Sequence, residues 1–217
     1  MKIQAREVLV LSPHTDDAII GAGGLIYKLS KQGCKITYHA FTMCNDTLVG
    51  TEFKKGEIAR EDKRAAEVLG ISVIIHHDFE NKQLQKSRQE ILDIIYEFRN
   101  NSNLDLVIAP YEGDFHQDHS TVAQEALRAS TRHQVTVLQY PVIGTSKDFN
   151  PNLFVPMTQE DVDAKVRAIS CYKTQFQLRN NWFSPTTFIA LLQTNGVYIN
   201  TKYAEAFIQV KGTWLVE

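Results

Sequence analysis

Cysteine is scarce in this sequence and long apolar runs are absent, and both shortages restrict what the protein can be. Among 217 residues only Cys34, Cys44 and Cys171 are cysteines. Their odd number, wide spacing and lack of a C-x-x-C pair argue against a disulfide framework and favour reduced thiols. No apolar stretch approaches the roughly 20 residues that cross a bilayer, and residues 1–6 contain no apolar signal core. The sequence therefore predicts a cytoplasmic protein without a membrane span.

Blocks of basic charge are also absent. The 23 Lys and Arg residues are interspersed with 25 Asp and Glu residues, for a formal net charge of -2. A nucleic-acid footprint requires clustered basic side chains, so no nucleic-acid partner is predicted. The length suits one sizeable domain, and the hydrophobic fraction of 43% is ordinary for a folded domain. The composition does not fix the oligomeric state, and a homo-oligomer is compatible with it.

Short β-branched runs alternate with segments of helical period along most of the chain. Strands are predicted at 7–12, 35–42, 71–76, 104–110 and 135–140, and helices at 17–32, 57–69, 87–99, 119–130 and 159–172. This alternation predicts an α/β fold, a Rossmann-like three-layer sandwich with a mostly parallel sheet. The sequence after Pro141 is less regular. We expect a single domain over 1–217, with a core at 1–145 and a small C-terminal cap at 146–217.

Two loops that follow buried strands are rich in histidine and aspartate. Residues 12–17 (SPHTDD) follow the first predicted strand, and residues 114–119 (DFHQDH) follow the fourth. In open parallel sheets ligands bind outside the carboxyl ends of the strands. If these two strands are neighbours, four carboxylates and three imidazoles meet at one edge of the sheet.

The spacing within these loops predicts a metal site. His14 and Asp17 lie three residues apart across a strand-to-helix turn, so both side chains can reach one point, and His119 can complete the set. Zinc is bound by imidazole nitrogen and carboxylate oxygen, and three protein ligands leave a position for water and substrate. We predict one Zn²⁺ per chain on these three residues, which also accept other divalent metals.

The remaining polar residues of the two loops suit catalysis. Asp16 stands beside the predicted metal without being needed as a ligand, and its carboxylate can take a proton from the attacking water. As an imidazolium, His116 can stabilise an oxyanion or protonate a leaving amine. Asp118, two residues further on, can hold His116 in one tautomer and raise its pKa.

Simpler interpretations exist for each residue taken alone. Asp16 and Asp17 precede an apolar helical segment, where aspartate is an ordinary N-cap residue. His116 and His119 alone suit the exposed start of a helix. Because two such clusters occur, each at the end of a buried strand, a shared metal site is favoured over separate N-cap and surface roles.

Two other kinds of site are also considered. The glycines within 21–24 suggest a phosphate loop, but 13–17 separates them from the strand end, and close helix packing is the better interpretation. A facial triad of His116, Asp118 and His133 resembles iron oxygenase sites, which usually occur on all-β folds. The cluster at 76–78 is left out of the site.

The two loops resemble the signature motifs of a known enzyme family. Residues 13–17 (PHTDD) and 116–119 (HQDH) are similar to the paired motifs of the LmbE-like (PIG-L) zinc-dependent de-N-acetylases. That family includes deacetylases of N-acetylglucosaminyl-phosphatidylinositol and of the mycothiol and bacillithiol sugar precursors. The segments 65–70, 105–110 and 203–207 also resemble family segments. The resemblance implies removal of an acetyl group from an N-acetylated amino sugar, a small-molecule substrate, with release of acetate.

The resemblance implies the same roles as the residues themselves. His14, Asp17 and His119 match the family's zinc ligands. Asp16 matches the general base, His116 the residue that assists the oxyanion and leaving amine, and Asp118 its carboxylate partner. The chain departs from the family pattern at Gln117, where proline is usual, and at Ile58, where several members have arginine; Arg60 and Arg64 are out of register.

Two further functions are open at this point. The same chemistry could act on a non-sugar N-acyl metabolite, or the chain could be a non-catalytic metal- or sugar-binding module. A module would need neither Asp16 nor His116, so the presence of both favours an enzyme.

Overall fold

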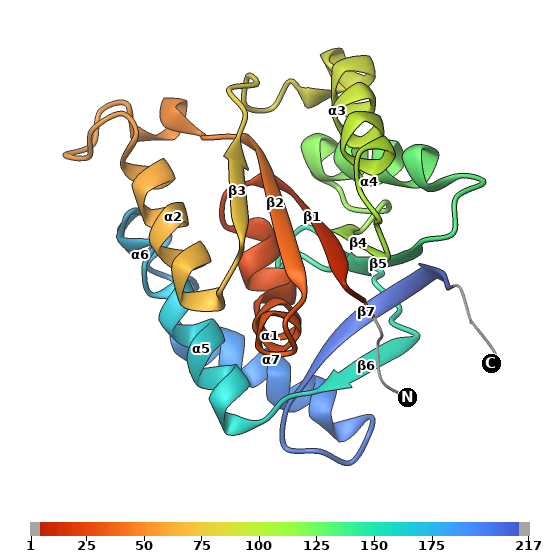
Figure 1. Cartoon of the computed structure of the whole chain (residues 1–217). Helices are drawn as coiled ribbons and strands as arrows, with labels where there is room; N and C mark the ends of the chain where they lie inside the picture. The colour runs from red at the N-terminus through yellow and green to blue at the C-terminus, as the bar shows by residue number, and fades with distance from the viewer. Residues whose placement is uncertain (1–4, 213–217) are drawn as a thin grey trace.

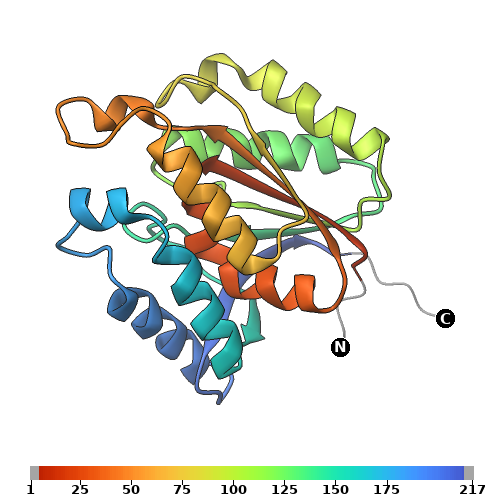
Figure 2. The ribbon, with the colours of Figure 1, turned by 60° about the vertical axis from the view of Figure 1, so that its left-hand side comes forward.

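The computed structural model describes residues 5–212 and contains one central sheet covered by helices on both faces (Figures 1 and 2). Residues 1–4, part of the segment 1–6 in which the sequence shows no apolar signal core, lie outside the described part. The strands are β1 (Glu7–His14), β2 (Lys35–Thr42), β3 (Val73–His76), β4 (Leu106–Pro110), β5 (Thr136–Tyr140), β6 (Leu153–Pro156) and β7 (Ala204–Lys211). The helices are α1 (Asp17–Lys31), α2 (Glu57–Leu69), α3 (Arg88–Asn100), α4 (Gln117–Ser130), α5 (Gln159–Ile169), α6 (Lys173–Leu178) and α7 (Pro185–Val197), with short 3-10 turns at Asn45–Leu48 and Leu84–Lys86.

The order of strands in the sheet confirms the predicted fold class. The order is β3-β2-β1-β4-β5-β7-β6, and the first five of these strands run parallel. The order reverses direction at β1, where the crossover from β3 returns to β4 on the other side. Such a reversal point opens a crevice at the carboxyl ends of the two central strands. Both loops predicted to carry the site leave the sheet there.

The C-terminal third contains the helix predicted at 159–172, observed as α5, but is more regular than the sequence suggested. Strand β7 pairs antiparallel with β5, and β6 pairs antiparallel with β7, so this region extends the sheet. Helices α6 and α7 were not predicted either. Pairing β7 with β5 joins residues about 70 positions apart, for example Leu138 with Gln209. A pattern read within a short window carries no information about such long-range pairing.

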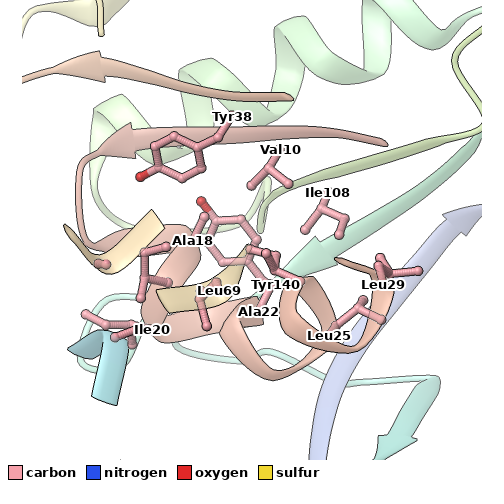
Figure 3. Close-up of a cluster of buried hydrophobic side chains, with 14 of the residues drawn as sticks. Val10, Ala18, Ile20, Ala22, Leu25, Leu29, Tyr38, Leu69, Ile108 and Tyr140 are labelled. Atoms are coloured by element: carbon pink, nitrogen blue, oxygen red, sulfur yellow. The ribbon is translucent and has the colours of Figure 1, made fainter. Parts of the chain in front are cut away.

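Two buried apolar clusters hold the helices to the sheet. One lies between the sheet and α1, α5 and α7, and Figure 3 shows part of it, including Val10, Tyr38, Ile108 and Tyr140 around α1. The other joins Leu9, Leu11 and Val107 to α3 and α4. Alternate residues of β1 therefore pack into opposite layers, as expected for a strand buried on both faces.

The glycines of α1 serve close packing and not phosphate binding. A Cβ on Gly21 would lie 2.3 Å from the Tyr140 ring, and one on Gly24 would lie 2.8 Å from the sulfur of Met157. The Gly24 amide also donates to the buried Glu205 carboxylate at 2.8 Å. Side chains at these positions would push the helix off the sheet, which confirms the packing interpretation. Within 5–212, no helix has the length and apolarity to cross a membrane.

Candidate metal centre

The two polar loops meet because β1 and β4 are adjacent parallel strands, with Val10 opposite Ile108. Each strand ends in a loop that leads into a helix, α1 and α4 respectively. The side chains at the helix starts therefore face one another across the crevice. This places His14 and Asp17 from one loop against His119 from the other.

The donor atoms of these three residues converge. The Nδ1 atom of His14 lies 2.9 Å from Oδ2 of Asp17, and Nε2 of His119 lies 3.1 Å from the same oxygen. The two ring nitrogens are 3.2 Å apart. Ligands at tetrahedral zinc are about 3.3 Å from one another, given bonds of about 2.05 Å. The spacing and the chemistry of this donor set therefore fit a divalent cation of the zinc type.

A buried carboxylate stands behind each of the two histidines. The outer nitrogen of His14, Nε2, lies 3.2 Å from Oδ2 of Asp118, and the outer nitrogen of His119, Nδ1, lies 3.1 Å from Oδ1 of Asp114. Asp118 is 0% exposed and Asp114 is 6% exposed. The Asp118 carboxylate can accept the outer N–H of His14, which leaves the inner nitrogen as a lone-pair donor, as in many metal sites. Asp114 lies at ion-pair distance from His119 and favours its charged form.

Backbone and hydroxyl donors hold the two carboxylates. Asp118 accepts the amides of Lys82 at 2.7 Å and Leu84 at 3.1 Å. Asp114 accepts the Thr145 hydroxyl at 3.0 Å and also the Ser146 hydroxyl. Both carboxylates are thus oriented by segments outside the two loops, so the site depends on the surrounding fold.

The placement of Asp118 differs from its predicted pairing with His116. Its carboxylate faces His14, and only its backbone amide reaches His116, donating to Nδ1 at 3.2 Å. His116 is the N-cap residue of α4. Side chains two positions apart at a helix start point to different sides, so a carboxylate at 118 cannot face a ring at 116.

The carboxylates give the centre a strong preference for positive charge. Burial alone lowers the pKa of His14, but Asp17 and Asp118 outweigh it and raise this pKa to about 9. Burial likewise opposes the charge on His119, yet Asp17 and Asp114 raise its pKa to about 10. Burial disfavours the charged form of Asp17, but the two histidines hold its pKa well below the ordinary value. The carboxylates thus favour positive charge at this point, whether it comes from protons on the imidazoles or from a bound cation.

Metal uptake should therefore release protons. With pKa values of about 9 and about 10, the His14 and His119 rings each carry a second proton at pH 7 when no metal is bound. A metal ligand must be unprotonated, so binding one Zn²⁺ displaces about two protons, and affinity falls as pH is lowered. Calorimetric titration in two buffers of different ionisation enthalpy measures this number. Release of no protons at pH 7 would contradict the assigned ligands.

The ring of His116 lies beside the rings of His14 and His119 but has a much lower pKa than either. It stacks on His119 with centroids 4.5 Å apart and meets His14 edge-on at 4.7 Å. Burial and the positive charge of these two rings lower the pKa of His116 to about 4. Because Nδ1 accepts a backbone N–H, the proton of the neutral ring is on Nε2. The ring is thus a hydrogen-bond donor at neutral pH and not the expected imidazolium.

Asp16 occupies the N-cap position of α1 but does not cap it. Its backbone is helical and its side chain accepts no capping hydrogen bond. Burial and the charge of Asp17 raise the pKa of Asp16 to about 6, while Arg179 and His14 act in the opposite direction. A carboxyl group with this pKa can accept and return a proton near neutral pH.

The remaining residues considered from sequence lie outside the centre. His133 follows α4, so about 18 Å of helix, from Asp118 to Ser130, separates it from Asp118 and His116, which rules out a shared facial triad. His76 pairs with the buried Asp62 at 2.7 Å. Ile58 is buried at 1% exposure, and Arg60 pairs with Glu57 at 2.6 Å on the helix surface.

Sequence reasoning missed two contributors. Asp114 belongs to the loop 114–119, but the sequence analysis gave it no role. An aspartate five positions before His119 could have suggested a partner for that histidine. Arg179 follows α6 and its charge acts on Asp16. No sequence signal links residue 179 to the first loop, because the relation arises only when α6 packs at that edge.

The fold and the centre together define a class of protein, an α/β protein in which histidine and aspartate side chains converge at the crevice between β1 and β4 and could hold a divalent cation. Metal-dependent hydrolases use such an arrangement. The family model described as GlcNAc-PI de-N-acetylase (PIG-L) matches residues 9–130, more than half of the chain. The chain therefore belongs to this family and is a hydrolase of the de-N-acetylase type.

Individual relatives agree with this assignment over longer stretches. Diacetylchitobiose deacetylase of Thermococcus kodakarensis is 29% identical, over 97% of this chain and 85% of its own. The solved structure of N,N'-diacetylchitobiose deacetylase from Pyrococcus horikoshii shares the fold, with a TM-score of 0.76 and 24% identity over 95% of this chain and 86% of that one.

A second similar structure has a different activity in its name. It is GalB, the 4-carboxy-2-hydroxymuconate hydratase of Pseudomonas putida, with a TM-score of 0.77 and 19% identity over 98% of this chain and 99% of that one. The likeness of these structures therefore concerns the fold, and the chemistry must be argued from the site.

Proposed function

We propose that the protein is a zinc-dependent hydrolase that removes the acetyl group from the nitrogen of an amino sugar conjugate and releases acetate. The observation that carries this proposal is the convergence of His14, Asp17 and His119 within 3.2 Å of one another, with Asp16 next to them in the chain. A purely structural metal site has no use for an additional carboxylate whose pKa lies near neutrality.

The metal would be held by the inner nitrogens of the two histidines and by Asp17. When bound, a zinc ion supplies Lewis-acid chemistry, polarising the amide carbonyl and lowering the pKa of water. A wider set, His14, His116 and His119, has donor atoms within 4.8 Å of one another. The set of His14, Asp17 and His119 is preferred because the Asp17 carboxylate offsets the charge of the cation. In addition, His116 keeps a proton on Nε2 and cannot ligate through that atom.

The chain's own residues account for the proton transfers. Asp16 takes a proton from the attacking water and returns it to the departing amine, since its pKa of about 6 suits both directions. His116 donates its Nε2 proton as a hydrogen bond to the carbonyl oxygen, where negative charge develops. Because the pKa of His116 is about 4, its ring stays neutral and donates a hydrogen bond without giving up a proton. The proton that the departing amine receives is therefore assigned to Asp16.

The relatives support a sugar as substrate. The family description refers to an N-acetylglucosamine conjugate, and a relative 29% identical to this chain is named for diacetylchitobiose. The arginine present in several members is replaced here by the buried Ile58, so the sugar must be contacted by other residues. The three cysteines are free thiols, which supports a reducing compartment such as the cytoplasm.

Product analysis tests the proposal directly. We expect the zinc-loaded protein to remove about 42 mass units, the general value for loss of an acetyl group, from at least one N-acetylhexosamine conjugate in a panel. Mass spectrometry of the amine and an enzymatic assay of acetate measure the two products together. Simple N-acetylated amines in the same panel test the non-sugar alternative.

The possible results separate the candidate functions. Turnover of simple acetylated amines without turnover of any sugar conjugate would reject the sugar assignment and keep the chemistry. Stoichiometric zinc with no deacetylation of any compound would favour a non-catalytic binding module.

A further inference from the structure

The backbone carbonyl of Thr15, between His14 and Asp16, is held by two buried tyrosines from distant parts of the chain. The Tyr38 hydroxyl on β2 lies 2.5 Å from this oxygen, and the Tyr172 hydroxyl lies 2.9 Å from it. Both tyrosines are 0% exposed. Tyr172 stands between α5 and α6, so the C-terminal region reaches the first catalytic loop through it.

A buried carboxylate holds the same two hydroxyls. Oδ1 of Asp62, on α2, lies 2.5 Å from the Tyr172 hydroxyl and 3.4 Å from that of Tyr38. Its other oxygen pairs with Nε2 of His76 at 2.7 Å. Asp62 is 0% exposed, and no part of the proposed reaction uses it. Residues of α2, β2, β3 and the α5–α6 junction thus form one hydrogen-bonded group around Thr15.

Proton counting shows that both tyrosines are needed. Each hydroxyl has one proton, and the two protons serve two buried acceptor atoms, the Thr15 carbonyl oxygen and Oδ1 of Asp62, whose other oxygen pairs with His76. Burial raises the pKa of both phenols well above the ordinary value, so both remain donors. Removing either hydroxyl leaves one proton for two buried acceptors, and an unsatisfied buried acceptor drives a local rearrangement.

The geometry of the peptide unit connects this group to the reaction. The carbonyl oxygen of residue 15 and the Cα atom of residue 16 belong to the same planar peptide. Fixing the Thr15 oxygen therefore fixes the direction in which the backbone enters Asp16. General-base catalysis depends on that direction, because displacing a catalytic group by about 1 Å can reduce the rate about 100-fold.

We propose that Tyr38 and Tyr172, oriented by Asp62, are positioning residues that aim the Asp16 carboxylate at the reacting centre. The inference rests on the proposed function for the role of Asp16. It assigns the C-terminal region a part in catalysis, because Tyr172 belongs to that region and the family match ends at residue 130.

Another tyrosine provides a matched control. Tyr140 is 0% exposed and lies in the same apolar cluster as Tyr38 (Figure 3). Its hydroxyl donates to a β1 carbonyl, that of Leu11, at 2.9 Å. Leu11 is inside the strand and not in the catalytic loop. The substitutions Tyr38→Phe, Tyr172→Phe and Tyr140→Phe each remove one buried hydroxyl, so a general loss of stability should affect all three alike.

The test compares kinetics in these three variants. We expect Tyr38→Phe and Tyr172→Phe to lower kcat about tenfold, with KM and zinc content within twofold of wild type. Tyr140→Phe should keep kcat within twofold while its Tm falls by a similar amount. Asp62→Asn, whose amide oxygen can still accept from Tyr172, should lose less activity than Tyr172→Phe. Equal kcat losses in all three tyrosine variants, or none in Tyr38→Phe and Tyr172→Phe, would overturn the inference.

Hydrogen exchange separates this inference from the proposed function. Peptides that cover residues 13–19 should exchange faster in Tyr38→Phe and Tyr172→Phe than in wild type, and unchanged in Tyr140→Phe. This measurement does not require a substrate. If the protein deacetylates nothing, the proposed function fails whatever the exchange data show. If exchange at 13–19 is the same in all variants, the positioning role fails even in an active enzyme.

Discussion

Replacing Asp16 with asparagine is expected to lower kcat for deacetylation about 1,000-fold while the protein still binds one zinc ion per chain. The amide keeps the size of the carboxylate but cannot take a proton, and general acid–base groups contribute about 100- to 10,000-fold to rate. Asp16 makes no contribution to the proposed ligand set, so metal affinity should change little. Steady-state acetate release and metal analysis of the same preparation measure both effects.

Asp78→Asn is the control for this substitution. Asp78 is an exposed aspartate in a loop that follows β3 and takes no part in the centre. The Asp78→Asn variant should keep both its zinc and full activity. An Asp16→Asn protein with wild-type kcat would remove the general base from the account, and one that lost its zinc would make Asp16 a ligand.

Replacing His119 with alanine should abolish metal binding and activity together. The substitution removes one of three convergent donors and leaves Asp17 and Asp114 facing each other across a site without its positive ring, both within 3.1 Å of the lost imidazole. We expect zinc content to fall from about one per chain to less than a tenth after dialysis, since three protein ligands are the usual minimum for a catalytic zinc.

Two further variants make this result specific. His133→Ala removes a histidine from the far end of α4 and should leave zinc and kcat unchanged. Asp114→Asn keeps His119 as a ligand but removes the negative charge of the carboxylate that pairs with it. This variant should reduce zinc affinity about 10- to 100-fold. Full zinc occupancy in His119→Ala would contradict the assigned ligand set.

Local sequence patterns were sufficient to predict the parallel core and the meeting of the two polar loops at one edge of the sheet. Strand β2 was predicted at its observed bounds, 35–42, because its β-branched run is compact and Gly33 ends the helix before it. Helix α2 was predicted at 57–69 for similar reasons, with Gly70 in the left-handed conformation after it. The rule that ligands bind at the carboxyl ends of parallel strands then identified the two loops that lie together in the structure.

The relations that could not be predicted all involve contacts between distant segments. The pairing of Asp118 with His14 spans 104 positions, and that of Tyr172 with Thr15 spans 157. Residue types and spacings suggested that Asp118 acts on a histidine, but only the helix geometry of α4 decides which one. The antiparallel strands β6 and β7 were missed for the same reason, since their partners are set by tertiary packing.

The proposed reaction depends on one cation held by His14, Asp17 and His119. A crystal structure of the zinc-loaded protein, with anomalous diffraction recorded at the zinc edge, tests this claim most directly. We predict one strong anomalous peak about 2.0–2.2 Å from Nδ1 of His14, a carboxylate oxygen of Asp17 and Nε2 of His119. A peak at bonding distance from His116, with Asp17 turned away, would contradict this ligand set. The absence of any peak between the two loops would contradict it as well.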